Sequence, residues 1–134
     1  MKIDMLNCLN ANRVCAAAGC LRAFNARSRH FAEYGDAPLE LTAMARCNGC
    51  GKGIDEVFRE KLDRIVSEGT EVCHLGVCTR HGEDKKECPT ITEAAAWLEA
   101  KGVRIVRLHA VSFPRVRPSD GQQEQIGMKR KKTS

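Results

Sequence analysis

The chain has 134 residues, a length that suits one domain, and 43% of them are hydrophobic, so the fold needs no disulfide scaffold for its core. The eight cysteines are a smaller share of the residues than the ~8–10% typical of small secreted disulfide scaffolds. The net charge is +5, but four of these charges come from residues 129–132, and only 4% of residues are aromatic. We therefore expect neither a specific nucleic-acid-binding surface nor, without a long apolar run, a membrane span.

Seven segments alternate between strand-like and helix-like patterns along the chain. Short apolar runs indicate strands, and apolar residues at helical spacing, followed by glycine, indicate helices. Residues 54–67 have the clearest helical stripe, and Thr90 and Glu93 have the spacing of a capping box. The predicted strands are residues 3–7, 39–45, 71–77 and 103–108, and the predicted helices are residues 21–33, 54–67 and 90–101.

This alternation predicts a small doubly wound α/β fold. Strands that alternate with helices form a parallel sheet with helices on both faces, and right-handed crossovers favour the strand order 2-1-3-4. The expected class is Rossmann-like or flavodoxin-like, with one cysteine-rich domain over residues 1–112. Residues 113–134 lose the periodicity and gain basic and polar residues, so we expect a flexible basic tail there.

Cysteines follow three of the predicted strands at their carboxyl ends. Others lie in the loop before the first helix or directly before the last helix. The carboxyl ends of parallel strands share one edge of a sheet, which is where such folds bind ligands. Thiols far apart in sequence are therefore predicted to converge at this edge. They are Cys8, Cys15, Cys20, Cys47, Cys50, Cys78 and Cys88.

The segment Cys47-Asn48-Gly49-Cys50 is a CxxC motif. Two cysteines at this spacing can chelate one tetrahedral metal ion or form a reversible disulfide bond. The neighbouring glycines permit a tight turn, and the predicted helix that follows places its positive end behind the sulfurs. Metal binding, thiol redox chemistry and simple packing all remain open for this pair.

Cys73 lies inside a predicted strand, where a cysteine behaves as a small buried hydrophobic residue. His74 and His109 lie near strand ends, where each could supply a nitrogen ligand or simply form a local hydrogen bond. We keep His74 as a reserve ligand. No carboxylate pair or Ser-His-Asp arrangement indicates a hydrolytic site, so no catalytic residue is assigned.

The order of these motifs resembles the CGGC-domain family, small cysteine-rich proteins of bacteria and archaea. The resemblance covers most of residues 1–110, with Cys-Asn-Gly-Cys in place of Cys-Gly-Gly-Cys. The resemblance implies zinc binding without an established reaction. It rests on the strand ending in Cys8, the pairs Val14-Cys15 and Gly19-Cys20, the motif at 47–50, the segment at 74–78, and Cys88-Pro89.

The start of the chain lacks the pattern of a signal peptide, so we expect a cytoplasmic protein. The reducing conditions of the cytoplasm favour metal ligation by clustered thiols. The leading hypothesis is a zinc-binding protein that uses a subset of the seven cysteines. An iron–sulfur cluster is an alternative cofactor, and a redox pair of Cys47 and Cys50 is an alternative function. A third possibility is metal sensing or delivery, with the basic tail contacting a protein partner.

Overall fold

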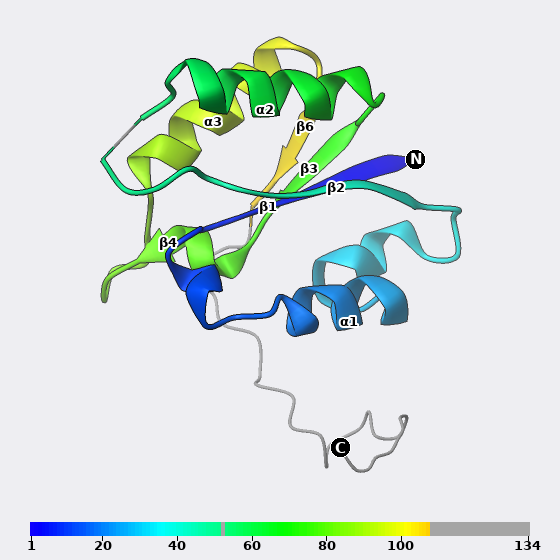
Figure 1. Cartoon of the computed structure of the whole chain (residues 1–134). Helices are drawn as coiled ribbons and strands as arrows, with labels where there is room; N and C mark the ends of the chain where they lie inside the picture. Colours follow the sequence, from blue (N-terminus) through cyan, green and yellow to red (C-terminus); the bar gives the residue numbers. More distant parts are fainter. Residues whose placement is uncertain (52, 108–134) are drawn as a thin grey trace.

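The computed structural model describes residues 1–51 and 53–107. Its main sheet has four parallel strands in the order β2-β1-β3-β6 (Figure 1). This confirms the predicted order 2-1-3-4, because β6 is the fourth of the predicted strands. The strands are β1 (Lys2–Asn7), β2 (Glu40–Arg46), β3 (Val72–Leu75) and β6 (Arg104–Val106).

Helices cover both faces of this sheet, as predicted. The helices α2 (Glu56–Ser67) and α3 (Pro89–Ala100) lie together on one face, and α1 (Ala18–Ala26) lies on the other (Figure 1). Each face buries its own apolar cluster: Phe58 and Leu98 belong to the first, and Ile3 belongs to the second. The sheet is therefore shielded on both sides, while its carboxyl edge is left to the loops.

The helix α2 forms for the reasons that its sequence indicates. Its apolar stripe buries Phe58, Leu62 and Ile65. The carboxylate of Asp55 caps its first turn by accepting a hydrogen bond from the Phe58 amide at 2.8 Å. Gly69, with a φ of 83°, ends the helical segment.

The predicted helix at 21–33 is divided in two. The helix α1 ends at Arg27, which adopts the left-handed conformation, and the 3₁₀ helix η2 (Arg29–Tyr34) follows. The Arg27 guanidinium donates to the carbonyl oxygens of Gly35 (2.8 Å) and Ala37 (2.7 Å), which holds this bend. Periodicity alone did not show the break, because a left-handed arginine has no sequence signature.

The start of α3 also differs from the prediction. Cys88 is the N-cap and Pro89 opens the helix, while Thr90 is buried within the first turn. The capping box at Thr90 is therefore wrong, and the fixed φ of proline begins the helix instead.

Four short 3₁₀ or strand elements near the carboxyl edge were not predicted. They are η1 (Ala11–Arg13), η3 (Val77–Thr79) and an antiparallel hairpin of β4 (Arg80–His81) and β5 (Lys86–Glu87). Elements of two or three residues are too short to show a period.

No helix within residues 1–51 and 53–107 is long and apolar enough to cross a membrane. The predicted tail at 113–134, the domain boundary at 112 and the candidate ligand His109 fall outside the described residues.

Candidate metal centre

Three cysteines are fixed at the carboxyl edge by the strands that precede them. Cys8 directly follows β1, and Cys47 directly follows β2, where its amide donates to the Asn7 carbonyl oxygen at 3.0 Å. Cys78 lies in η3, the turn after β3. The sheet itself therefore brings the ends of these three segments together, as the parallel topology predicts.

Cys8 and Cys78 are in direct contact. The Cys8 amide donates to Cys78 Sγ at 3.2 Å. The contact depends on Gly76, because a β-carbon at this position would overlap the Asn7 side chain and lie 3.3 Å from Cys78 Sγ. Glycine thus allows β1 and the β3–η3 turn to approach closely.

Four of the seven cysteines interact electrostatically around Cys78. Burial raises the pKa of the Cys78 thiol, and the hydrogen bond from the Cys8 amide opposes this shift. The neighbouring thiols of Cys8, Cys20 and Cys15 raise the same pKa further. Burial, and then the charge of Cys15, also raises the pKa of Cys20. Because such interactions act at short range, we define Cys8, Cys15, Cys20 and Cys78 as the four-cysteine cluster.

The loop before α1 brings Cys15 and Cys20 toward the edge. Ala17 adopts the left-handed conformation with a φ of 62° and precedes the helix, and its amide donates to Cys15 Sγ at 3.3 Å. Cys15 is exposed, and Cys20 is half-buried in the first turn of α1. The turn at Ala17 explains how Cys15 and Cys20, which have an irregular spacing in the sequence, can lie close together.

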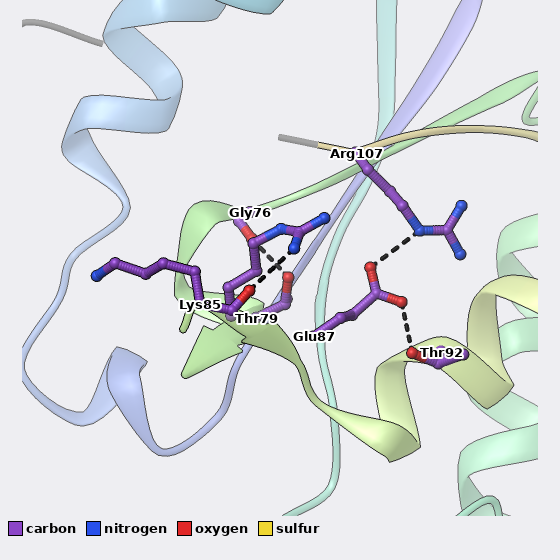
Figure 2. Close-up of polar contacts among 7 residues, drawn as sticks. Gly76, Thr79, Lys85, Glu87, Thr92 and Arg107 are labelled. Atoms are coloured by element: carbon purple, nitrogen blue, oxygen red, sulfur yellow. Dashed lines mark hydrogen bonds and ion pairs between the residues drawn. The ribbon is translucent and has the colours of Figure 1, made fainter. Parts of the chain in front are cut away.

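A layer of polar contacts supports the turn that holds Cys78 (Figure 2). Thr79 Oγ1 donates to the Gly76 carbonyl oxygen at 2.7 Å. Glu87 accepts one hydrogen bond from Arg107 Nε at 2.9 Å and another from Thr92 Oγ1 at 2.5 Å, joining the hairpin to β6 and α3. These contacts tie η3 to the rest of the domain.

Cys47 and Cys50 lie outside the four-cysteine cluster. The Cys47 sulfur accepts a hydrogen bond from the Leu9 amide at 3.4 Å. Cys47 packs with the core of α2 and α3, whereas Cys50 is exposed in the turn that follows. Lys61 of α2 is electrostatically coupled to Cys47, a partner for which the sequence pattern has no signal.

Cys88 and Cys73 pack with the apolar core on the α2–α3 face of the sheet. Cys88 is half-buried, packs against the α2–α3 core and donates its amide hydrogen to the Thr79 carbonyl oxygen at 2.8 Å. Cys73 is fully buried in β3, as predicted, and faces Asp4 of β1 across the ladder.

His74 is buried on the opposite face of the sheet from Cys73. Its ring stacks on Phe31 with centroids 4.3 Å apart, and its Nε2 forms a 2.7 Å hydrogen bond with the Tyr34 hydroxyl. Burial lowers the pKa of His74 to about 4, so the ring is neutral at pH 7. The local hydrogen bond that the sequence left open is therefore present, and Tyr34 had no sequence signal as its partner.

The donor chemistry at the four-cysteine cluster fits a thiophilic ion, because four sulfur atoms are the ligands of a closed tetrahedral site. In the part of the chain that the structure describes, no three His, Cys, Asp or Glu side chains are close enough to hold an ion as they stand. Closing the cluster on an ion therefore requires movement, and the exposed Cys15 belongs to a loop.

Comparison with known proteins agrees with the motif order. The model of the CGGC domain matches residues 2–109, which is most of the chain. No curated protein and no solved structure matches it. The match spans the sheet, both helical layers and all eight cysteines, and by this measure the chain belongs to the CGGC-domain family.

Proposed function

We propose that this protein binds a thiophilic metal ion, zinc in the first instance, through Cys8, Cys15, Cys20 and Cys78. The observation that supports this proposal is the contact between the Cys8 amide and Cys78 Sγ, together with the electrostatic effect of Cys8, Cys15 and Cys20 on Cys78; the four thiols come from three separate segments of the chain. Uncompensated thiols seldom gather in this way without a reason, and four thiolates match the ligand number of zinc.

The four ligands differ in how firmly the fold holds them. Cys8 and Cys78 are fixed by the sheet and by their mutual hydrogen bond, whereas Cys15 lies on the exposed loop before α1. Two fixed ligands can receive the ion first, and the loop can then close around it. Binding would therefore order the loop and stabilise the fold.

The remaining candidates are left out of this ligand set for physical reasons. Cys73 is enclosed in the core, and the Nε2 of His74 is engaged with Tyr34. Cys88 packs against the α2–α3 core, and Cys47 belongs to that core. In a reducing cytoplasm, where we place the protein, permanent structural disulfide bonds are not expected among these thiols.

The proposal is tested by metal analysis of full-length protein purified without oxygen. We expect about one zinc per chain and a colourless solution, and cobalt substitution should give the intense absorption of tetrahedral thiolate ligation. A brown solution containing iron and sulfide would instead support the iron–sulfur alternative.

Two matched variants locate the site. Cys78→Ser removes a half-buried cysteine of the cluster and should abolish stoichiometric zinc, whereas Cys88→Ser removes a half-buried cysteine outside it and should retain the metal. Full zinc in Cys78→Ser, with zinc loss in Cys88→Ser, would overturn the proposed ligand set.

A further inference from the structure

A pocket of about 370 Å³ lies beside Cys47, between the end of β2 and the first turns of α2. Its lining includes Cys47, Lys61, Arg46, Leu9 and Val57. This volume suits a small organic molecule, and the lining combines apolar side chains with a few polar groups, as ligand pockets do. None of these residues belongs to the four-cysteine cluster.

Lys61 is held in place against residues 46 and 48, on either side of Cys47. Its ammonium donates to the Arg46 carbonyl oxygen at 2.5 Å and to Asn48 Oδ1 at 2.6 Å. Burial lowers the pKa of Lys61, and Cys47 acts in the opposite direction, which places the two groups within electrostatic range. The Leu9 amide donates to the Cys47 sulfur, so a thiolate at Cys47 would accept this hydrogen bond and lie within electrostatic range of the Lys61 cation.

The two cysteines of the CxxC motif differ in access. Cys50 is exposed, whereas Cys47 is 4% exposed. Gly49 and Gly51 on either side of Cys50 have φ values of 119° and 80°, which only glycine adopts readily, and they form the tight turn. A disulfide substrate can therefore reach Cys50 directly, whereas Cys47 is shielded from it.

The charge of the pocket favours an anion. Two cationic side chains, Lys61 and Arg46, line it against one carboxylate, Asp55, whose Oδ1 already accepts the Phe58 amide. A carboxylate on a bound molecule would meet the Lys61 ammonium, while Leu9 and Val57 offer apolar surface to the rest of that molecule.

We propose that Cys50 and Cys47 reduce disulfides, RSSR, of small thiols that bear carboxylates. The Cys50 thiolate attacks one substrate sulfur, which breaks the substrate S–S bond, forms a mixed disulfide at Cys50 and releases RS⁻. The Cys47 thiolate then attacks the Cys50 sulfur, which forms the Cys47 to Cys50 disulfide and releases a second RS⁻. RSSR is the oxidant and takes two electrons, and the two protons from the protein thiols end on the two released thiols.

The test uses reduced full-length protein and two probes. Oxidised glutathione carries carboxylates, and cystamine is a disulfide of a cationic thiol without them. Intact-mass measurement over time should show a faster loss of two protein thiols with oxidised glutathione than with cystamine. Peptide mapping should place the new disulfide between Cys47 and Cys50. Equal rates for both probes, or zinc that stays bound to these two cysteines and blocks the reaction, would overturn the proposal.

Variants separate the roles of the residues. Cys50→Ser, at an exposed position that tolerates the change, should abolish the reaction, and Cys47→Ser should trap the mixed disulfide at Cys50. Lys61→Met should slow the reaction with oxidised glutathione about fivefold more than the reaction with cystamine, because only oxidised glutathione also loses the attraction between its carboxylates and the ammonium. Lys101→Met, on α3 beside Trp97, is the matched control and should react like the unmodified chain. A mixed disulfide that persists in Cys50→Ser, or a Lys61→Met rate equal to that of the control, would contradict the mechanism.

Discussion

Asp4 lies in the middle of β1 with no exposed surface. Neither carboxylate oxygen accepts a hydrogen bond of good geometry, although the Cys73 thiol and the Met5 amide lie close enough to oppose the effect of burial in part. Burial raises the pKa of Asp4 from 3.8 to about 6. The buried carboxylate is therefore a cost to stability at neutral pH, with no compensating partner among the described residues.

The pH dependence follows from the direction of this shift. The pKa of Asp4 is higher in the folded state, so its favourable contribution is complete below pH 3.8 and is lost as the pH rises through about 6. Asp4→Asn should therefore stabilise the protein at pH 7, by at most about 3 kcal/mol, and should have a smaller effect at pH 4. Urea unfolding at both pH values measures the difference.

His74 has the opposite effect on the pH dependence of stability, which makes the prediction for Asp4→Asn more specific. Its folded pKa of about 4 lies below the ordinary value of 6.5, so its contribution to stability is complete above pH 6.5 and is lost as the pH falls through about 4. In the unmodified chain, the change in stability with pH that Asp4 causes nearly cancels the change that His74 causes. Asp4→Asn should remove one of them, so that stability rises from pH 4 to pH 6.5. An unchanged pH profile in this variant would show that Asp4 does not ionise in the folded protein as described.

At the scale of elements, the turn between β3 and η3 is the junction that positions Cys78. Gly76→Ala should destabilise the protein by about 1–3 kcal/mol, because the new β-carbon overlaps the buried Asn7 side chain. Gly19→Ala is the matched control: a β-carbon there meets nothing within 4 Å, and alanine favours the helix α1. Chemical denaturation of both variants checks the prediction, which fails if Gly76→Ala is as stable as Gly19→Ala.

The elements that sequence analysis predicted well are those with enough length to show a period. The stripe of Phe58, Leu62 and Ile65 identified α2, and the alternation of strands and helices led to the correct sheet order. The errors lie at short or irregular places: the left-handed Arg27 that divides one predicted helix, and the hairpin of two-residue strands. At these places side-chain contacts between distant segments, which a local pattern does not contain, decide the conformation.

At the scale of the whole molecule, the shared edge of the cysteines was predictable, and their division was not. Parallel topology brings Cys8, Cys47 and Cys78 to the same edge. Of the four-cysteine cluster, Cys20 belongs to α1, whereas Cys47 packs with the core of α2 and α3. The direction of each turn depends on backbone conformations such as that of Ala17, which the sequence does not reveal.

This division leads to the two-site account that we propose: four thiols that bind a metal ion, and a CxxC pair that stays free to react. The two sites make different demands on the same chain. The metal site needs thiolates that stay bound, whereas the CxxC pair needs one accessible thiol, Cys50, and one shielded thiol, Cys47.

The most direct test of this account is zinc-edge X-ray absorption of the zinc-loaded full-length protein. It measures the ligand atoms of the metal without altering the chain. The account predicts four sulfur ligands at about 2.3 Å and no nitrogen ligand, in unmodified protein and in Cys50→Ser alike. A shell containing imidazole nitrogen, or a sulfur number that falls in Cys50→Ser, would contradict it.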